Sequence, residues 1–564
     1  MGNNKLLTVW LIFAISCSGH GHSAEEEEER DRRMHPIPKF SELQNEKLNA
    51  IEDTNFWISD AQEKLKKKLD VPRVNGVAKN VIFYLGDGMS ISTVTAARIF
   101  KGQVLDHLQF GEEAELYMES LPFTGFSKTF CANSQVADSA CSATAYLCGI
   151  KANDATIGVT SKVLRGSCAG QADPTNQVSS VLSWAQAAGK STGIVTTTRV
   201  THASPAGTYS HIADRDWEND GKVKADGENP KICEDIATQL IKREPGIKIN
   251  VILGGGRQQF TPKSEKDAEF PTLSGYREDG VNLIDEWISM KNSSRGRYVS
   301  GRDQLLTVDP AETDYLLGLF DPSHVSYYDQ QLANNDPTLE EMTEAAIKIL
   351  GKNPNGFFLF VEGGRIDHAH HDNFAHRALW ETVEFDKAIK KGDDLTQDDD
   401  TLIVVTSDHA HAMGFAGYPP RGTEILGFPP LFLTTDLRPY NTLFYANGPG
   451  PSMYNDQGRR RNILMDHFYN RTYQVPSPVP LESETHGGDD VLIFAKGPYA
   501  HLYVGTHQQS YIPHVIGFSA CLGDGAKSPL CKDVPDNNGA TLVVSGCIVG
   551  VMLFFTRLAV KYSI

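Results

Sequence analysis

The stretch that decides the fold is Phe357-Phe358-Leu359-Phe360-Val361-Glu362-Gly363-Gly364-Arg365-Ile366-Asp367-His368-Ala369-His370-His371. It opens with a short, continuously apolar run, which predicts a buried strand that ends in Glu362. If a helix begins near Ile366, Asp367 and His371 lie one turn apart on one face, within reach of a single metal ion. The alternative is a solvated, histidine-rich helix start, and the apolar strand in front of the histidines argues against it.

Two more apolar runs end in groups that bind metals. Residues 81–85 lead into Gly86-Asp87-Gly88, whose glycines let other groups approach the backbone closely. Residues 401–406 lead into Ser407-Asp408-His409, which places a carboxylate and an imidazole at a strand end. Taken alone, Asp87 fits a turn aspartate better than a ligand, and Glu484-Thr485-His486 adds only one histidine in a loop.

Strand-like and helix-like segments alternate along the chain. Further β-branched runs occupy residues 191–197 and 249–253, and apolar residues recur every three or four positions in residues 176–188, 233–242 and 339–350. This alternation predicts an α/β fold in which helices flank a central, mostly parallel sheet. Because ligands bind such sheets beyond the carboxyl ends of the strands, the polar residues that end these strands are the candidates for the functional site.

A nucleophile and an anion-binding group are also present. Ser139 lies in Asp138-Ser139-Ala140, ahead of an alanine-rich helix start where free N–H groups and the helix dipole favour a phosphate. On this segment alone, a simple helix N-cap explains Ser139 better. Arg215 could grip two phosphate oxygens, or it could form a surface ion pair with a neighbouring aspartate. Two metal ions held by Asp and His ligands would clamp the oxygens of a phosphoryl displacement.

Composition excludes some classes of protein. With 564 residues and ordinary apolar content, the chain is long enough for a large core. A formal net charge of −18 argues against nucleic-acid binding. The segment of about residues 417–483 has many Pro, Tyr, Asn and Arg residues and little periodicity, which predicts an insertion into a main domain of residues 51–535.

Both ends of the chain carry targeting signals. Residues 1–23 have the order of a secretory signal peptide, and residues 24–50 form an acidic, solvated arm. Residues 536–564 have the pattern of a signal for attachment of a glycosylphosphatidylinositol (GPI) anchor. A transmembrane helix is the weaker alternative, because the apolar run is shorter than the roughly 20 residues that a spanning helix needs.

The cysteines indicate an oxidising compartment. Of the nine, Cys17 and Cys547 lie in segments that processing would remove, which leaves an odd number and one free thiol. Cys148, inside an apolar stretch, is the best candidate for a buried free thiol. The sequons at Asn292 and Asn470 are usable for N-glycosylation in this compartment.

Several of these segments together closely resemble animal alkaline phosphatases of the membrane-anchored, GPI-type and invertebrate-like kind. The likeness extends from about Asn55 to Cys531. It rests on these strings, which follow one another in the family's order: Gly86-Asp87-Gly88-Met89, Asp138-Ser139-Ala140, Thr196-Thr197-Thr198-Arg199-Val200-Thr201-His202-Ala203-Ser204-Pro205, the stretch from Val361 to His371, Ser407-Asp408-His409 and Glu484-Thr485-His486.

The resemblance implies hydrolysis of phosphate monoesters of many alcohols, with an alkaline optimum, through a phosphoserine. Ser139 is then the nucleophile, Arg215 binds the phosphoryl group, and His202 and His368 lie in the neighbouring shell. The implied metal ligands are Asp367, His371 and His486 for one zinc ion, Asp87, Asp408 and His409 for a second zinc ion, and Asp87, Ser204 and Glu362 for a magnesium ion. The implied calcium ligands are Glu269, the carbonyl of Phe320, Asp321 and Asp336, with Asp321 in place of the family's usual Glu.

The family's disulfides fall at Cys168 with Cys233 and at Cys521 with Cys531. Cys131 and Cys141 are outside the vertebrate pattern, and we expect them to pair and brace the loop that carries Ser139. The segment of residues 417–483 corresponds to the family's crown at the dimer interface. The resemblance therefore implies a homodimer, held by a lipid anchor on the outer face of the plasma membrane.

Two alternatives to this function stay open at the level of sequence. One is a related phosphodiesterase or sulfatase, although the segment after Ser139 lacks the Pro and Arg that sulfatases need. The other is a surface receptor or binding protein with a vestigial site. The full set of predicted ligands argues against a binding role alone.

Overall fold

The computed structural model describes Glu29, Met34 and residues 52–429 and 434–531. The predicted signal peptide, almost all of the acidic arm, and the predicted anchor signal lie outside the described residues, as do Cys17 and Cys547. None of the described helices is both long enough and apolar enough to cross a membrane.

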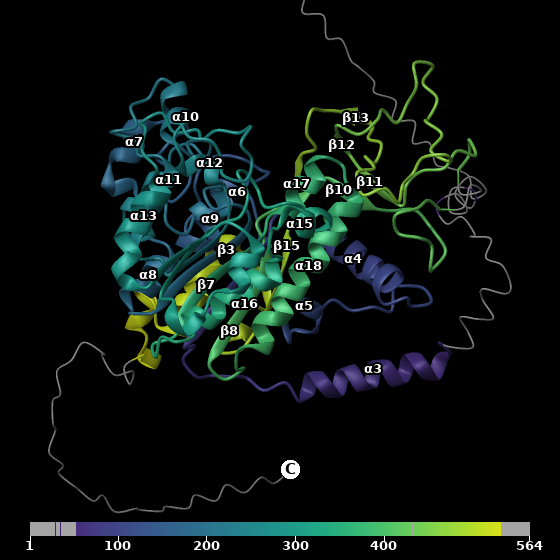
Figure 1. The fold of residues 1–564 in the computed structure, drawn as a ribbon. Coiled ribbons are helices and arrows are strands. Elements are labelled where there is room, and N and C mark those ends of the chain that lie inside the picture. The colour runs from purple at the N-terminus through teal and green to yellow at the C-terminus, as the bar shows by residue number, and fades with distance from the viewer. Residues whose placement is uncertain (1–28, 30–33, 35–51, 430–433, 532–564) are drawn as a thin grey trace, which may run out of the picture.

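The centre of the molecule is a ten-stranded, mostly parallel sheet with helices on both faces, which confirms the predicted fold class (Figure 1). In spatial order its strands are β16 (Gly505–Gln508), β2 (Phe123–Lys128), β15 (Val491–Lys496), β8 (Thr401–Ser407), β1 (Asn80–Gly86), β7 (Phe357–Gly363), β3 (Ser191–Arg199), β4 (Val251–Gly255), β6 (Tyr315–Leu319) and β5 (Gly296–Val299). Only β15 runs antiparallel to its neighbours in this sheet.

The register of the central strands brings the predicted ligands to one edge. β1 lies between β8 and β7 and is parallel to both, with Gly86 opposite Ser407 in β8 and Leu85 opposite Glu362 in β7. β3 follows on the other side of β7, also in parallel. Because all four strands point the same way, the residues at their carboxyl ends meet.

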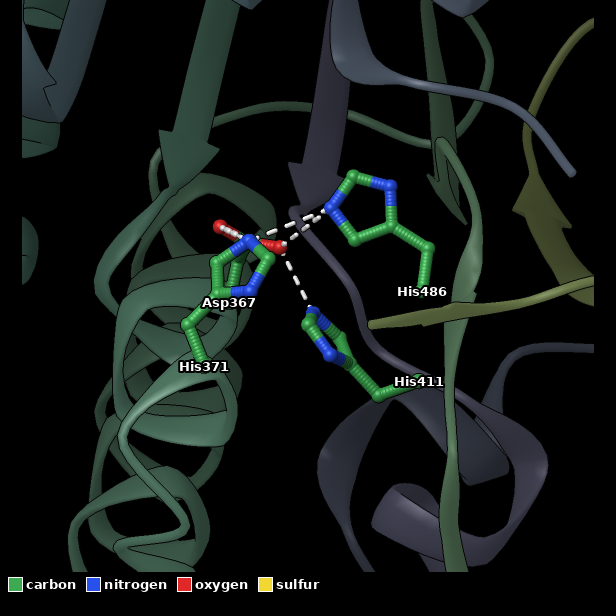
Figure 2. A group of neighbouring side chains, drawn as sticks. All are labelled: Asp367, His371, His411 and His486. Carbon is green, nitrogen blue, oxygen red and sulfur yellow. Dashed lines mark hydrogen bonds and ion pairs between the residues drawn. The ribbon is translucent and has the colours of Figure 1, made fainter. Parts of the chain in front are cut away.

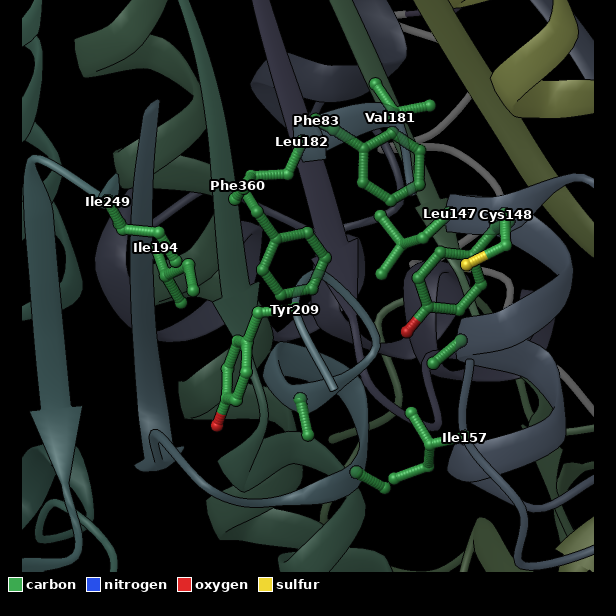
Figure 3. Close-up of a cluster of buried hydrophobic side chains, with 14 of the residues drawn as sticks. Phe83, Leu147, Cys148, Ile157, Val181, Leu182, Ile194, Tyr209, Ile249 and Phe360 are labelled. Atoms are coloured by element: carbon green, nitrogen blue, oxygen red, sulfur yellow. The ribbon is translucent and has the colours of Figure 1, made fainter. Parts of the chain in front are cut away.

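The three central strands β1, β7 and β8 are buried along their whole length. Successive side chains of a strand point to opposite faces, so Phe83 in β1 packs in one core and Tyr84 in the other. Figure 3 shows Phe83 and Phe360 side by side in the first core, and their rings stack with centroids 6.0 Å apart. Burial on both faces explains why these strands are continuously apolar in sequence.

Helices cover each face of the sheet. The first core contains α6 (Ser139–Cys148), α8 (Val181–Ala187), α9 (Ala203–Ala206), α11 (Ile236–Lys242), α13 (Leu283–Lys291) and α19 (Ile512–Ala520). The second contains α4 (Ile91–Phe100), α5 (Tyr117–Ser120), α14 (Arg302–Leu306), α16 (Leu339–Leu350), α17 (Arg365–His371) and α18 (Ala375–Asp394). The short helices α7 (Cys168–Ala172), α10 (Asp220–Ala225) and α12 (Arg257–Phe260) each add one residue to the first core, and α15 (Tyr328–Asn334) is a further short helix.

The predicted helices are present with corrected bounds. α16 spans the predicted residues 339–350, because Thr338 and Glu341 form a capping box at its start. α8 begins only after Ser180, whose hydroxyl caps it, and α11 begins only after Asp235, whose carboxylate caps it. The apolar periodicity of both segments therefore extends beyond the helices themselves.

The segment of residues 417–483 has little regular structure among its described residues. It holds β11 (Leu443–Tyr445), which pairs with β10 (Met413–Phe415), and the two-residue strands β12 (Asn447–Gly448) and β13 (Val479–Pro480). In Figure 1 it stands beside the sheet domain, above α4. At the other end of the molecule, α3 (Thr54–Leu69) extends away from the body and buries none of its side chains.

The disulfides agree with expectation. Cys168 bonds to Cys233, Cys521 bonds to Cys531, and the pair outside the vertebrate pattern, Cys131 with Cys141, is also joined. Among the described cysteines, Cys148 alone is free, and burial raises the pKa of its thiol to about 12. The side chains of Asn292 and Asn470 are exposed, as N-glycosylation requires.

A core variant tests the central position of β7. Phe360 is fully buried, so Phe360→Ala leaves a cavity and should lower the free energy of unfolding by about 3–5 kcal/mol. The matched control is Phe126→Ala in β2, whose side chain is 40% exposed and should lose far less. Chemical denaturation followed by circular dichroism measures both, and equal losses would contradict the buried position of β7.

Candidate metal centre

The candidate site lies where β8, β1, β7 and β3 end. Asp87 directly follows β1, Glu362 is near the end of β7, and Asp408 and His409 follow β8. Ser204 belongs to the short helix α9 just after β3. The loop with His486 reaches the same edge because β14 (His486–Gly487) pairs with β9 (Ala410–His411). Side chains from widely separated segments thus converge on one edge of the sheet.

The first group of ligand atoms surrounds the carboxylate of Asp367 (Figure 2). α17 places His371 one turn after Asp367, as predicted, with its Nε2 3.3 Å from Asp367 Oδ2. His486 Nε2 lies 3.5 Å from Asp367 Oδ1, and His411 Nε2 lies 2.6 Å from the same oxygen. The three predicted residues of this group therefore do come together, and His411 joins them.

Backbone carbonyls fix the orientation of two of these rings. His371 Nδ1 lies 2.6 Å from the carbonyl of Glu484, and His486 Nδ1 lies 2.8 Å from the carbonyl of Ala137. A carbonyl only accepts, so each Nδ1 carries a hydrogen and each ring turns its Nε2 inward. The two Nε2 atoms are only 3.2 Å apart. Two lone pairs at this distance need a proton or a cation between them.

The second group lies against the predicted nucleophile. His409 Nε2 is 3.1 Å from Asp408 Oδ2 and 3.7 Å from Asp87 Oδ1. Ser139 Oγ lies 3.2 Å from the same His409 nitrogen and donates to Asp87 Oδ1 at 3.5 Å. The Gly88 backbone N–H donates to Asp408 Oδ1 at 2.9 Å and fixes that carboxylate. One serine hydroxyl thus faces a fully buried cluster of two carboxylates and an imidazole.

The third group shares Asp87 with the second. One oxygen of Glu362 accepts hydrogen bonds from the hydroxyls of Thr196 and Thr198, the latter at 3.0 Å. Within this group, three buried oxygens have no hydrogen-bond partner among the described residues: Glu362 Oε1, Asp87 Oδ2 and Ser204 Oγ. Unpaired buried oxygens are costly in a folded protein. A hard cation is a suitable partner for carboxylate and hydroxyl oxygens, so these residues fit a magnesium ion.

The electrostatics of the metal-free site oppose its own ionisation. Burial raises the pKa of Asp87 well above its usual range, and the nearby carboxylates Asp408, Asp367 and Glu362 raise it further. Burial also raises the pKa of Asp408, and it raises that of Glu362 to about 7. Bound cations would reverse this balance by favouring the ionised carboxylates. The donor set therefore fits divalent metal ions.

Asp367 behaves differently from the other carboxylates. Burial opposes its ionisation, but His371 and His411 outweigh burial and hold its pKa well below the usual range. In return, Asp367 raises the pKa of His371 against the effect of burial. A positive charge is thus favoured between these side chains, carried by a proton when no metal ion is bound.

Ser139 is not the N-cap of its helix, so the simple capping alternative is wrong. Asp138 caps α6 by accepting from the Cys141 backbone N–H at 3.1 Å, which leaves the Ser139 hydroxyl free to face the site. The second oxygen of Asp138 accepts from Arg215 Nη1 at 3.1 Å. Arg215 therefore pairs with the residue next to Ser139, whereas its own neighbours in sequence, Asp214 and Asp216, pair with Arg165.

The neighbouring histidines have separate roles. His202 Nε2 accepts from Arg215 Nη2 at 3.1 Å, and His368 Nδ1 accepts from Arg365 Nη1 at 3.0 Å. His370, buried in the same motif, bonds to the hydroxyls of Thr93 and Tyr445 and is structural. The three histidines of the Asp367 motif thus have different positions. His368 lies beside the candidate metal site, His370 lies in the core, and His371 lies in the first group of ligand atoms.

Sequence reasoning missed His411 and Glu484 as parts of the site. Glu484 begins the quoted motif Glu484-Thr485-His486 and His411 lies two residues after His409, but neither has a sequence pattern that separates a ligand from its support. In the structure, His411 bonds to Asp367 on one side and to Glu484 on the other, and these carboxylates together raise the pKa of His411 to about 10 against the effect of burial. Only the pairing of β9 with β14 brings Glu484 to this position.

The predicted calcium ligands lie in one region but are engaged by the protein. Glu269 forms an ion pair with Arg257 at 2.7 Å, Asp321 accepts from the Ser323 backbone N–H, and Asp336 accepts from the Ser326 backbone N–H. Burial raises the pKa of Asp336 to about 6, with further contributions from Asp321 and Glu269. Calcium binding here stays a prediction.

Comparison with known proteins agrees with this geometry. Residues 78–522 match the family described as alkaline phosphatase. The chain is 47% identical over 483 residues to the membrane-bound alkaline phosphatase of Bombyx mori, covering 84% of this chain and 87% of that protein. It is 48% identical over 507 residues to the tissue-nonspecific alkaline phosphatase of Homo sapiens, covering 89% and 94%.

A solved structure agrees in fold. The alkaline phosphatase of Thermus thermophilus superposes with a TM-score of 0.56 at 22% identity, covering 80% of this chain and 92% of that one. At that identity the likeness shows the fold alone. The family match and the close relatives span the whole candidate site, from Asp87 to His486, and that site holds a serine hydroxyl beside grouped carboxylates and imidazoles. The chain therefore belongs to the alkaline phosphatase family and is an enzyme that hydrolyses phosphate monoesters.

Proposed function

We propose that the chain hydrolyses phosphate monoesters through a phosphoserine at Ser139, in a site that holds two zinc ions and one magnesium ion. The observation that carries this proposal is the position of the Ser139 hydroxyl, 3.2 Å from His409 and 3.5 Å from Asp87. The proposed ligands are Asp367, His371 and His486 for one zinc ion, Asp87, Asp408 and His409 for the other, and Asp87, Ser204 and Glu362 for magnesium. When bound, the cations supply electrostatic stabilisation to the oxygens that enter and leave phosphorus.

The chain's own residues then position the reaction. Arg215, already held by Asp138, presents a guanidinium that binds two nonbridging oxygens of the phosphoryl group. Ser139 Oγ forms a bond to phosphorus while the bond from phosphorus to the ester oxygen breaks, and the alcohol leaves with a proton. The oxygen of a water molecule then forms a bond to phosphorus while the bond between Ser139 Oγ and phosphorus breaks, a proton of the water returns to Oγ, and phosphate is released. Because the protein grips the phosphoryl half, the enzyme accepts many alcohols.

The alternative functions have weaker support. A phosphodiesterase needs room for a second ester group, and no feature of the described site favours one. A receptor with a vestigial site would tolerate substitution of its metal-ligand residues. All eight proposed ligand residues are present in this chain and lie at one edge of the sheet. Calcium binding by Glu269, Phe320, Asp321 and Asp336 is part of the proposal, supported by their shared region.

We further propose that the mature enzyme is GPI-anchored on the outer face of the plasma membrane. The support is the sequence pattern of residues 536–564, the disulfides of an oxidising compartment, and the membrane-bound silkworm relative. That relative also supports the invertebrate-like assignment. The proposed domain plan is a signal peptide in residues 1–23, an acidic arm in 24–50, a catalytic domain in 51–535 with a crown in about 417–483, and the anchor signal.

A homodimer is proposed on the basis of α3. In the single chain, more than half of the surface of each of three apolar residues of this helix is exposed: Trp57, Leu65 and Leu69. Apolar side chains gathered on one unpacked helix mark an interaction surface. A second copy of the chain, meeting the crown and α3 of the first, would cover them.

Ser139→Ala should abolish turnover without emptying the metal site. The variant loses the atom that bonds to phosphorus, so kcat/KM for a chromogenic phosphate monoester should fall by a factor on the order of 10³ or more. The matched control is Ser142→Ala, because Ser142 is buried in the same helix but bonds to the carbonyl of Asp138. Elemental analysis of both variants reports their metal content. Near-normal activity of Ser139→Ala would refute the assignment.

Metal binding at the third group should weaken as the pH falls. In the metal-free protein burial raises the pKa of Glu362 to about 7, so above pH 7 the carboxylate is ionised and below it a proton competes with the cation. The affinity for Mg²⁺ should then drop about tenfold per pH unit for each proton displaced. Calorimetric titration of metal-depleted protein at pH 6 and pH 8 measures this.

The control for this titration is Glu381→Gln. The pKa of Glu381 is also raised to about 7 by burial, but its carboxylate accepts from the Tyr328 backbone N–H, and Glu381 is in none of the ligand groups described above. Glu362→Gln should remove part of the pH dependence, and Glu381→Gln should keep it. The same pH dependence in both variants would show that Glu362 does not bind the cation.

A phosphatidylinositol-specific phospholipase should release the enzyme from membranes. If residues 536–564 direct attachment of a GPI anchor, treatment of intact cells moves phosphatase activity into the medium. A chain truncated before residue 536 should be secreted without treatment. Activity that stays with the membrane would favour the transmembrane alternative instead.

A further inference from the structure

Three histidines and three arginines, Arg215 among them, form a cluster of contacting side chains beside the candidate site. The rings of His202, His324 and His368 contact one another, with centroid distances of 5.5 Å, 5.4 Å and 4.2 Å. Each ring has its own arginine, and the pairs are His202 with Arg215, His324 with Arg199, and His368 with Arg365. All six side chains are partly exposed. We define them here as the Arg–His cluster.

Hydrogen bonding keeps the imidazoles of the cluster neutral. A guanidinium only donates, so in each pair the imidazole nitrogen accepts. Burial lowers the pKa of all three histidines well below the usual range, and the neighbouring arginines lower it further. The charge of the cluster therefore comes from its arginines.

The arginines are not equally neutralised. Arg199 forms a two-point ion pair with Glu218, with contacts of 2.6 and 2.8 Å, and Arg215 pairs with Asp138 at 3.1 Å. Arg365 has no carboxylate within ion-pair distance among the described residues. It packs over the ring of Tyr327 at 3.7 Å, and its Nε is buried without a hydrogen-bond partner there. The charge of Arg365 acts on three carboxylates only at longer range, where it lowers their pKa values: those of Asp321, Asp372 and Glu381.

We propose that Arg365 lines a second anion subsite, adjoining the phosphoryl site, that binds a phosphate or carboxylate group on the alcohol half of the substrate. The subsite begins at Arg215, which holds the transferred phosphoryl group, and continues through the contacting rings to Arg365. An anion there would meet a partly exposed guanidinium that no carboxylate of the described residues holds in an ion pair. The inference rests on the proposed role of Arg215.

Matched substrates test the subsite. Phenyl phosphate is compared with 3-carboxyphenyl phosphate, 4-carboxyphenyl phosphate and 4-(phosphonomethyl)phenyl phosphate, which add one carboxylate or one phosphonate. The quantity is the ratio of kcat/KM for each charged substrate to that for phenyl phosphate. In Arg365→Gln this ratio should fall about three- to tenfold, which is the value of one partly exposed charge-assisted contact. It should also fall with rising salt concentration in the unmodified enzyme.

Arg377→Gln is the matched control. Arg377 packs over the same Tyr327 ring, at 4.4 Å, but pairs with Asp329 at 3.2 Å. Its loss should leave the substrate ratio unchanged. A binding measurement without turnover accompanies this comparison: competitive inhibition by methylenebisphosphonate relative to methylphosphonate should weaken in Arg365→Gln and not in Arg377→Gln.

The outcomes separate the two proposals. An equal loss on every substrate in Arg365→Gln, or the same change of ratio in Arg377→Gln, would assign Arg365 a structural role and overturn the subsite. An unchanged ratio in Arg365→Gln would overturn it as well. A larger fall with the carboxylates or with the phosphonate would identify the preferred group. Failure of the unmodified enzyme to hydrolyse phenyl phosphate would instead count against the proposed function.

Discussion

The structure depends on one constraint: carboxylates that follow adjacent parallel strands are forced together where water cannot reach them. β1 lies between β8 and β7, so Asp87 meets Asp408 on one side and Glu362 on the other. Burial and mutual repulsion raise the pKa values of these groups. A fold that accepts such a concentration of buried acid needs cations to balance it.

The surrounding hydrogen bonds explain how loops that are remote in sequence become one site. The carbonyl of Ala137 orients His486, Asp138 holds Arg215, and Ser139 follows directly. The disulfide between Cys131 and Cys141 closes the short segment that contains Ala137, Asp138 and Ser139. A cross-link around a loop restricts its conformations, and here it restricts the loop that carries Ser139 and holds His486 and Arg215.

Charge at the mouth of the site is arranged differently from charge inside it. The interior gathers acids, which suit bound cations, whereas the arginines lie beside it and, in our proposal, attract the anionic substrate. This local arrangement explains how a chain with a formal net charge of −18 handles phosphate esters. The three imidazoles between the two regions stay neutral because arginines donate to them.

The sequence by itself determined the sheet, the strand ends and the ligand types. Continuous apolar runs predict strands buried on both faces, and the spacing of Asp367 and His371 predicts one helix turn between them. Both can be predicted from sequence because each depends on residues that are close together in the chain. The starts of α8 and α11 were harder to predict from sequence, because capping by Ser180 and Asp235 begins each helix later than the apolar periodicity indicates. Only the tertiary structure decided that Asp138 rather than Ser139 caps α6, that Glu484 supports His411, and that His324 joins the Arg–His cluster. Those contacts join segments that are distant along the chain, and no local pattern encodes which distant side chain will arrive.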